Sequence, residues 1–323
     1  MYLCQGNGTK IGIMQLGVVL TSLFFLLRLI KAETEQLTWN EVTLNNGIVT
    51  RERQVTSEVE LFPLHKANRR RREIYHPDDR VQFNATTNQE FPYSTVVRIS
   101  TGCTGILIER RFVLTAAHCI HDRKEVKSRY IRVGYLNKQG KTKWHYAKKI
   151  FYPTQWKLEK KIEDWADYDY AVIKVPRKLG KSRGFIEPGL SIGDHHGEGD
   201  TVYFIGFPDD KPLNQTWGSW CTVLATTQSL FYFECDAIHG VSGSGIYTRE
   251  ENCQTKESIR RVVGVLSGNR YSPVYHRRFN VGVRLDPHRY MQVCKWIRRE
   301  DECKKRYQEY FDEDIVKSDD CPS

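Results

Sequence analysis

The sequence predicts an all-β fold that ends in one α-helix. Short runs rich in Val, Ile, Tyr, Phe and Thr recur between turn signals, from STVVRIS at 94–100 to NVGVRL at 280–285. Short strands at such spacing are typical of a β-barrel or a β-sandwich. No long helical segments alternate with them, so a parallel α/β sheet is not expected. Near the end, Tyr290, Val293, Trp296 and Ile297 recur at helical spacing behind Pro287, which predicts a helix with its apolar face on the strands.

The composition indicates a folded and basic protein. Of 323 residues, 40% are hydrophobic and 27% are charged, which favours a buried core over general disorder. The formal net charge is +10. Such a charge favours acidic partners, namely sulfated glycans, anionic membrane surfaces or nucleic acid, but a basic secreted surface has the same composition. Of these possibilities we expect a protein that is secreted and has a basic surface, and we expect no nucleic-acid partner.

The N-terminal segment predicts export. Lys10 precedes the apolar run IGIMQLGVVLTSLFFLLRLI, which ends just before Lys31 and Ala32. A basic start, an apolar centre and a small residue at the end are typical of a secretory signal, so we expect cleavage after Ala32. An uncleaved signal anchor is the alternative. We therefore predict an extracellular protein that meets a membrane only during secretion.

The cysteines agree with export. Nine are present, and Cys4 lies ahead of the apolar run, so removal of the signal leaves an even set of eight. An even set in an exported chain predicts disulfides. No CxxC pair occurs, which argues against a zinc ribbon, and neither a metal nor another cofactor is expected. In a secreted chain, Asn84 and Asn214 are glycosylation acceptors.

The remaining chain divides at an arginine run. Residues 33–68 are polar without a sustained period, and Arg69 to Arg72 follow them. Such a run is exposed, and in a secretory protein it predicts processing after Arg72. A basic surface and a glycan-binding patch are the alternatives. We divide the chain into a signal peptide (1–32), a propeptide or polar N-terminal extension (33–72), a folded domain (73–303) and a C-terminal tail (304–323). Inside the domain, the Lys/Arg-rich region between Asp122 and Asp164 is a solvated face or an anion-binding surface for heparan-type glycans.

Three motifs carry residues suited to nucleophilic chemistry. His118 in LTAAHC follows an apolar run and has small neighbours, which leave room for an imidazole in a cleft. Asp169 in DYDYAVIKV enters a buried strand, where a carboxylate needs hydrogen bonds. Asp167 is a second candidate for that role, and the alternative for Asp169 is an ordinary turn residue at the end of a strand. Ser242 in GVSGSG stands on a glycine turn of the kind that exposes a nucleophile beside backbone N–H groups; a flexible Gly/Ser turn is the alternative.

The order of these residues is that of the chymotrypsin-type triad. The segments TGCTGILIERRFVLTAAHCIHD, DYAVIKV, CDAIHGVSGSGIY and VCKWI resemble the serine protease 23 and serine protease 35 branch of the trypsin-like serine peptidases, over about residues 69–303. The resemblance implies a two-barrel fold with the active site between the barrels. It makes 73–303 a peptidase domain, with His118 as general base, Asp169 as its orienter and Ser242 as nucleophile. The N–H groups of Gly240 and Ser242 would form the oxyanion hole.

The implied function is that of a secreted serine endopeptidase acting on protein or peptide substrates. Serine protease 35 is inactive because its nucleophile is replaced, whereas this chain keeps Ser242. The alternative is a secreted pseudoprotease or a glycan-binding protein on the same scaffold. The resemblance also implies the disulfides Cys103–Cys119, Cys221–Cys235 and Cys294–Cys303, which leaves Cys253 with Cys321. Sequence alone would allow 105 connectivities for eight cysteines.

Departures from the ordinary trypsin-like pattern stand around the serine. His239 occupies a place where a proline is expected, and Val241 replaces the aspartate that pairs with a newly cut N-terminus. The site should therefore form without that ion pair. Asp236, six residues before Ser242, has the offset of a primary-specificity carboxylate, but Ile238 stands where the pocket cysteine would be. Ser267 in GVLSGN is expected at the cleft wall, where it would hydrogen-bond Asp169 or the substrate backbone.

Overall fold

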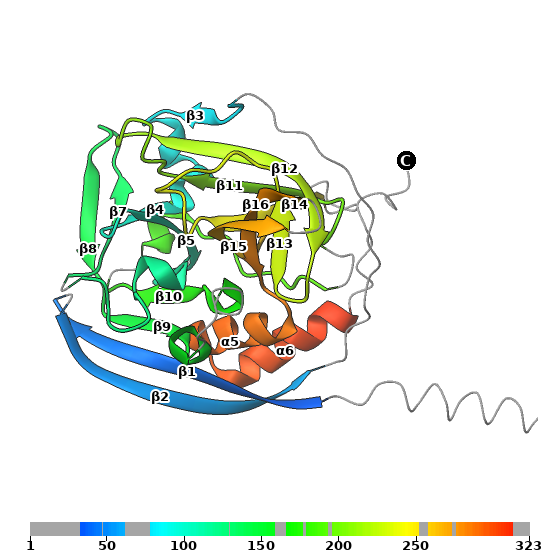
Figure 1. Ribbon diagram of the computed structural model, residues 1–323. Helices are drawn as coiled ribbons and strands as arrows, with labels where there is room; N and C mark the ends of the chain where they lie inside the picture. Colours follow the sequence, from blue (N-terminus) through cyan, green and yellow to red (C-terminus); the bar gives the residue numbers. More distant parts are fainter. Residues whose placement is uncertain are drawn as a thin grey trace, which may run out of the picture.

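The computed structural model describes residues 33–46, 48–61, 78–128, 130–158, 166–176, 179–192, 196–251, 258–272 and 276–312 (Figure 1). Within these residues the strands form two antiparallel sheets. The predicted two-barrel, trypsin-like fold with a C-terminal helix is confirmed.

The first sheet has the strand order β2-β1-β9-β10-β6-β5-β4-β7-β8. Its centre is apolar on both faces, since every residue of FVLT in β6 is buried. The bounds of its strands are β1 Glu33–Asn45, β2 Ile48–Leu61, β4 Val96–Ile99, β5 Cys103–Glu109, β6 Phe112–Thr115, β7 Arg132–Leu136, β8 Thr142–Tyr146, β9 Lys149–Pro153 and β10 Ala171–Lys174.

The second sheet has the order β11-β14-β15-β16-β13-β12-β3, and β11 also pairs with β12, which closes a barrel. Closure removes the free edges that an open sheet would present. The bounds of its strands are β3 Val81–Phe83, β11 Thr201–Gly206, β12 Thr216–Thr226, β13 Leu230–Phe233, β14 Gly245–Glu251, β15 Ser258–Ser272 and β16 Arg277–Arg284.

Short helices connect the strands, and two longer ones end the described chain. The bounds are η1 Thr87–Gln89, η2 Tyr93–Thr95, η3 Ala117–Cys119, α2 Gln155–Leu158, η4 Ala166–Tyr168, α4 Gly180–Arg183, α5 Pro287–Ile297 and α6 Glu300–Asp312. In α5 the Asp286 carboxylate caps the helix by accepting from Arg289 N at 2.9 Å, and Pro287 is its first residue. Tyr290, Val293 and Trp296 are buried, as their spacing predicts.

A second helix, which was not predicted, follows the predicted C-terminal helix and extends beyond residue 303. The chain leaves the helical conformation at Arg298, and α6 then continues to Asp312. Two buried side chains hold α6 in place: Cys303, which is bonded to Cys294 of α5, and Tyr307, whose ring lies 6.4 Å from that of Tyr290. The sequence places many charges in this segment, which hid the narrow apolar stripe.

Residues 33–61 form a strand hairpin, although no strand was expected there. β1 pairs with β2 and also with β9, so the hairpin extends the first sheet (Figure 1). Leu37, Val42 and Leu44 of β1 belong to the main hydrophobic core. The arginine run at 69–72 and the apolar run at 11–30 lie outside the described residues. Among the residues described, no helix is long and apolar enough to span a membrane.

Candidate active site

The antiparallel pairing of β6 and β10 brings His118 and Asp169 together. Ala171 of β10 lies opposite Thr115 of β6, so the residues just beyond the end of β6 meet those just before β10. His118 lies in η3, and Asp169 directly follows η4. Of the two candidates Asp167 and Asp169, it is Asp169 whose carboxylate contacts His118.

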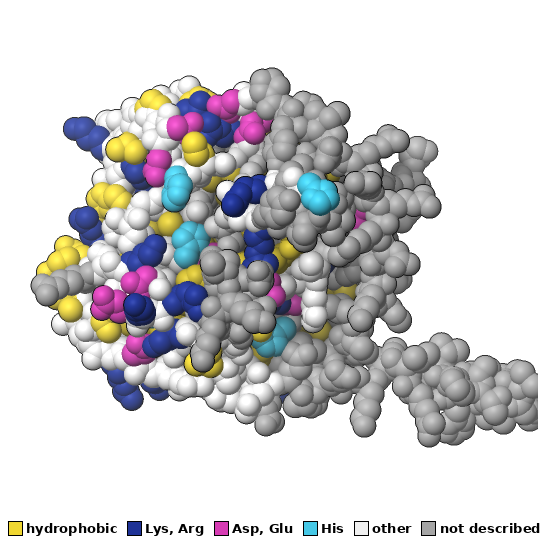
Figure 2. Space-filling model, in the orientation of Figure 1, with side chains coloured by type: hydrophobic (Ala, Val, Ile, Leu, Met, Phe, Trp, Pro, Cys, Tyr) yellow, Lys and Arg dark blue, Asp and Glu magenta, His cyan; other side chains and the backbone are white. Residues whose placement is uncertain are grey.

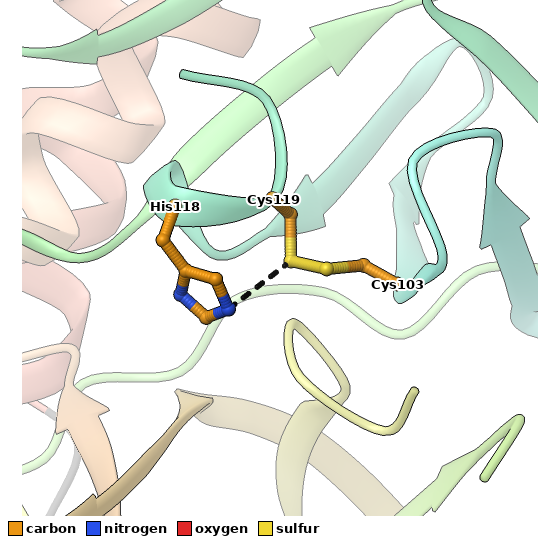
Figure 3. A group of neighbouring side chains, drawn as sticks. All are labelled: Cys103, His118 and Cys119. Atoms are coloured by element: carbon orange, nitrogen blue, oxygen red, sulfur yellow. Dashed lines mark hydrogen bonds between the residues drawn. A yellow bond between two sulfur atoms is a disulfide. The ribbon is translucent and has the colours of Figure 1, made fainter. Parts of the chain in front are cut away.

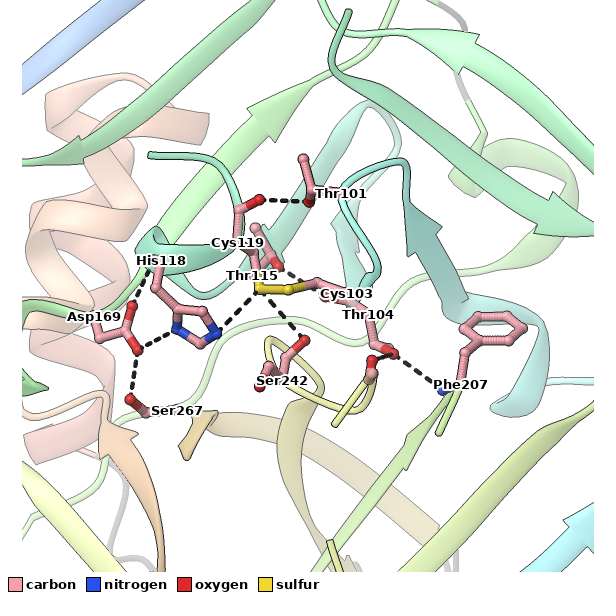
Figure 4. Close-up of a disulfide and its surroundings, with 11 residues drawn as sticks. Thr101, Cys103, Thr104, Thr115, His118, Cys119, Asp169, Phe207, Ser242 and Ser267 are labelled. Atoms are coloured by element: carbon pink, nitrogen blue, oxygen red, sulfur yellow. Dashed lines mark hydrogen bonds and ion pairs between the residues drawn. A yellow bond between two sulfur atoms is a disulfide. The ribbon is translucent and has the colours of Figure 1, made fainter. Parts of the chain in front are cut away.

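The Asp169 carboxylate holds the histidine at two points. Its Oδ2 lies 2.7 Å from His118 Nδ1, and its Oδ1 accepts from the backbone N–H of His118 at 2.8 Å (Figure 4). Asp169 is fully buried, and Ser267 Oγ of β15 donates to Oδ2 at 2.5 Å. With Nδ1–H donating to Asp169, the lone pair of the imidazole is on Nε2, which is the arrangement that a general base requires.

Ser242 lies on the turn between β13 and β14. Gly240 and Gly243 on either side have φ angles of 93° and 84°, which L side chains rarely adopt. A Cβ at Gly240 would come within 2.3 Å of Phe207 O, and one at Gly243 within 2.2 Å of Thr115 Oγ1. The glycines therefore serve both the backbone angles and the close packing of the turn, and the turn is not a flexible Gly/Ser segment.

The two predicted oxyanion amides point away from the bonded side of the turn. His239 O accepts from Asp209 N at 2.9 Å, and Val241 O accepts from Ser244 N at 3.0 Å. Because N–H and C=O point in opposite directions across a trans peptide, these bonds direct the N–H groups of the following residues, Gly240 and Ser242, to the other side. Among the described residues neither amide has an acceptor. Both are available to an oxyanion.

His118 and Ser242 both lie next to Cys119 Sγ, and no direct hydrogen bond joins the two residues within the described part of the chain. Nε2 of His118 lies 3.7 Å from Cys119 Sγ (Figure 3). That sulfur is bonded to Cys103 and carries no proton, so the contact is a van der Waals one. Catalytic hydrogen bonds are often long before substrate binds, so the lack of this bond does not exclude His118 and Ser242 as a base and nucleophile.

The same three residues do not make a metal site. Ligand atoms of Cys103, His118 and Cys119 lie within 4.8 Å of one another. A metal takes thiolates, and both sulfurs are committed to the disulfide. The bond instead fixes the η3 turn that carries His118.

Comparison with known proteins decides the family. A family model described as Trypsin matches residues 80–291. The chain belongs to the trypsin family.

Relatives place it in the branch that the sequence motifs indicated. The chain is 36% identical over 253 residues to serine protease 23 of Bos taurus, covering 72% of this chain and 67% of that protein. It is 30% identical over 337 residues to inactive serine protease 35 of Homo sapiens, covering 84% of this chain and 80% of that protein. The chain thus spans about two thirds of the serine protease 23 that it matches. One of these relatives is named inactive, so membership of the branch does not by itself establish catalytic activity.

A solved Glu endopeptidase in complex with MPD shares the fold. The likeness has a TM-score of 0.55 at 20% identity and covers 69% of this chain and 99% of that one. Disulfides join Cys103 to Cys119, Cys221 to Cys235 and Cys294 to Cys303, which agrees with the pairing that the branch implied. Cys253 and Cys321 lie outside the described residues.

Val241 replaces the trypsin-family ion pair by apolar packing. Its side chain is 3% exposed and belongs to the core of the second barrel, which includes Val202, Phe204 and Ile246. An aspartate there would place a carboxylate in a buried position that the chain fills with an apolar side chain. The neighbouring His239 is exposed, and its carbonyl oxygen accepts from Asp209 N. The substitution at 239 therefore leaves the turn intact.

Asp236 lies beside the segment that leads into β3. One carboxylate oxygen accepts from Asp79 N at 3.0 Å. Nearby, Arg80 bridges Asp78 at 2.8 Å and Asp210 at 2.6 Å, and acidic and basic side chains lie interleaved at this end of the molecule (Figure 2). Hydrogen bonds from Arg80 and Lys211 hold the pKa of Asp78 well below its ordinary value. Residues 78–80 are thereby anchored next to the predicted specificity residue.

Sequence reasoning missed Thr104 of β5, which ties the serine turn to the first barrel. Thr104 is fully buried; its Oγ1 donates to Gly240 O at 2.8 Å and its N–H to Ser242 O at 2.9 Å. The hydroxyl also accepts from Phe207 N at 3.0 Å. Thr104 was visible within TGCTG, but a threonine in a strand carries no signal for a partner more than a hundred residues away.

Proposed function

We propose that the protein is a secreted serine endopeptidase. Ser242 attacks a peptide carbonyl, His118 takes its proton at Nε2 and returns it to the leaving amine, and water then releases the acyl-enzyme. Protein or peptide substrates follow from membership of the trypsin family.

The observation that carries this proposal is the double contact of Asp169 with His118. Bonds to both N and Nδ1 of one residue fix the position and the tautomer of the ring. A fully buried carboxylate also stabilises the imidazolium that forms when Nε2 gains a proton.

The amides of Gly240 and Ser242 supply the second requirement of acyl transfer. Preorganised N–H groups stabilise the oxyanion of the tetrahedral intermediate, and loss of one such donor costs roughly 10²–10³ in kcat in related chemistry. Both amides lack acceptors within the described residues, as an oxyanion hole requires.

A fluorophosphonate probe tests the proposal, because it reacts with an activated serine and needs no known substrate. We expect the exported protein to be labelled and Ser242→Ala and His118→Ala to abolish labelling. Ser244→Ala is the matched control: Ser244 lies two residues away, is fully buried and has no hydrogen-bond partner for Oγ within the described residues. Absence of labelling at every pH from about 6 to about 9, in protein that is folded, would contradict the enzyme and favour the pseudoprotease alternative.

Asp236 is the proposed primary-specificity residue, and it would select Lys or Arg before the cut. Its bond to Asp79 N occupies one oxygen and leaves the other without a hydrogen bond within the described chain. Asp236→Asn should lower kcat/KM for such substrates while Ser242 labelling persists. Equal hydrolysis of substrates with Arg and with Glu before the cut would refute this assignment.

Processing and modification complete the proposal. We propose cleavage after Ala32 and after Arg72, and N-glycans at Asn84 and Asn214, both of which are exposed. Binding to heparan-type glycans draws less support, because two lysines of the basic region, Lys149 and Lys157, form ion pairs with acidic side chains of the hairpin. Retention of the protein on a heparin column that weakens as the salt concentration rises would support glycan binding.

A further inference from the structure

We propose that residues 33–61 are a permanent part of the peptidase rather than a removable propeptide. After cleavage at the arginine run, they stay bound as a light chain held only by non-covalent contacts. This inference rests on the processing step of the proposed function. Its binding surface is the edge of β9 together with α5.

The backbone of β1 continues the sheet of the peptidase domain. Trp39, Asn40, Glu41, Val42 and Thr43 pair with residues 149–153 of β9. Two further bonds lengthen the contact at its ends: one from the backbone N–H at 44 to the carbonyl at 148, at 2.8 Å, and one from the N–H at 154 to the carbonyl at 38, at 3.4 Å. Removal of the hairpin would leave β9 as an open edge with unpaired N–H and C=O groups.

The two strands of the hairpin differ sharply in burial. Leu37, Val42 and Leu44 of β1 are at most 4% exposed and pack in the main core, whereas Ile48 and Val49 of β2 are 44% and 40% exposed. β1 is thus an interior strand of the sheet and β2 its outer edge (Figure 1). Release of this segment would expose apolar surface of the main core to water, which is unfavourable.

Polar contacts across the same surface are specific. Glu52 of β2 accepts from Tyr152 Oη at 2.6 Å and from Lys157 Nζ at 3.0 Å. The nearly buried Glu41 pairs with Arg53 at 2.8 Å within the hairpin and with Lys149 of β9. Bonds from both ions lower the pKa of Glu41 against the opposing effect of burial.

One chain of contacts runs from the hairpin to the catalytic aspartate. Gln292 of α5 is fully buried; its Nε2 donates to Thr38 O at 3.1 Å and its Oε1 accepts from Tyr170 Oη at 2.5 Å. Tyr170 is the residue after Asp169 and is itself fully buried. Loss of Thr38 would leave a buried amide N–H group without this acceptor, next to the strand that positions Asp169.

No covalent bond would hold a cleaved hairpin. Residues 33–72 contain no cysteine, so none of the disulfides can retain the segment. Retention after cleavage would therefore report the non-covalent contacts alone.

The test uses the full exported chain with a recognition sequence for a specific viral protease inserted before Arg69. The purified protein is cut, passed over a size-exclusion column and examined on a denaturing gel. We expect the two fragments to co-elute in equal amounts and to separate only in denaturant. Release of the hairpin from a domain that stays folded would overturn the inference.

Two variants of the cut protein sharpen the result. Val42→Asp places a carboxylate in the core, and the retained fraction should fall at least about ten-fold. Val49→Asp makes the same change on the exposed strand and should leave retention unchanged. If Val42→Asp does not fold, a urea titration of the cut parent decides: hairpin release at the midpoint of domain unfolding supports the inference, and release at clearly lower urea contradicts it.

Retention is measured independently of catalysis. Failure of fluorophosphonate labelling in the uncut protein would count against the proposed function and leave the elution result valid. Labelling that survives loss of the hairpin would count against the light-chain role alone.

Discussion

Val241 offers the sharpest test of how the serine turn is held. Where other members of the family have an aspartate that pairs with the new N-terminus, this chain has an apolar side chain that is 3% exposed and belongs to the core of the second barrel. Packing between Gly240 and Ser242 should therefore fix the two oxyanion amides. We predict that Val241→Asp, which restores the ordinary trypsin-family residue, abolishes labelling of Ser242.

The magnitude follows from the surroundings of the side chain. Val241→Ala removes two buried methyl groups, worth about 0.8 kcal/mol each, and leaves a small cavity, so we expect a loss of about 2 kcal/mol. In Val241→Asp a carboxyl would replace a buried apolar side chain of the core cluster that includes Val202, Phe204 and Ile246. If its pKa rises by about 3 units, keeping it buried costs about 4 kcal/mol at pH 7, a large part of the stability of an ordinary domain.

The assay pairs unfolding with labelling. Urea unfolding gives the global loss, and the fluorophosphonate rate reports the turn. Val202→Ala, a change of the same size in the same core but on β11, is the control: it should lose similar stability and label at the parental rate while folded. The reasoning is refuted if Val241→Ala slows labelling no more than Val202→Ala, or if Val241→Asp labels normally.

Further predictions concern activation, the oxyanion turn and pH. Replacing Arg69–Arg72 with alanines should leave the labelling rate of the uncut protein unchanged, because no carboxylate stands at 241 to receive a new N-terminus; a requirement for cutting would argue otherwise. Gly240→Ala should lower kcat by roughly 10²–10³, because its Cβ would meet a carbonyl oxygen at 2.3 Å; an unchanged kcat would exclude the amide from catalysis. Burial lowers the pKa of His121 from 6.5 to about 4. Between these two pH values the unfolded chain binds the proton more readily than the folded one, so the free energy of unfolding falls as the pH drops, by up to about 3 kcal/mol. His121→Asn should flatten the change in urea midpoint between about pH 7 and about pH 4.5, and an unaltered slope would assign the acid sensitivity to other groups.

Local signals account for what sequence reasoning found. The glycines around Ser242, the small residues before His118 and the apolar strand after Asp169 each reflect a requirement of their own few residues. Together with their order they predicted the fold and a candidate triad, and the structure brings His118 and Asp169 into contact. The apolar spacing of α5 predicted that helix for the same reason.

The sequence by itself determined which residues could do the chemistry, while the tertiary structure decided what holds them and what belongs to the domain. β1 escaped detection because its buried centre contains the polar residues Asn40 and Glu41, which interrupt the apolar pattern of a strand. Glu41 is paired with Arg53 and Lys149, and β9, which carries Lys149, lies over a hundred residues downstream. Other contacts likewise join distant segments: the hydrogen bond from Thr104 to Gly240, the packing of Val241 in the core of the second barrel, and the hydrogen bond from the backbone N–H of Asp79 to Asp236. Periodicity and turn chemistry describe a residue and its near neighbours, and only the closed sheets bring such distant groups within bonding range.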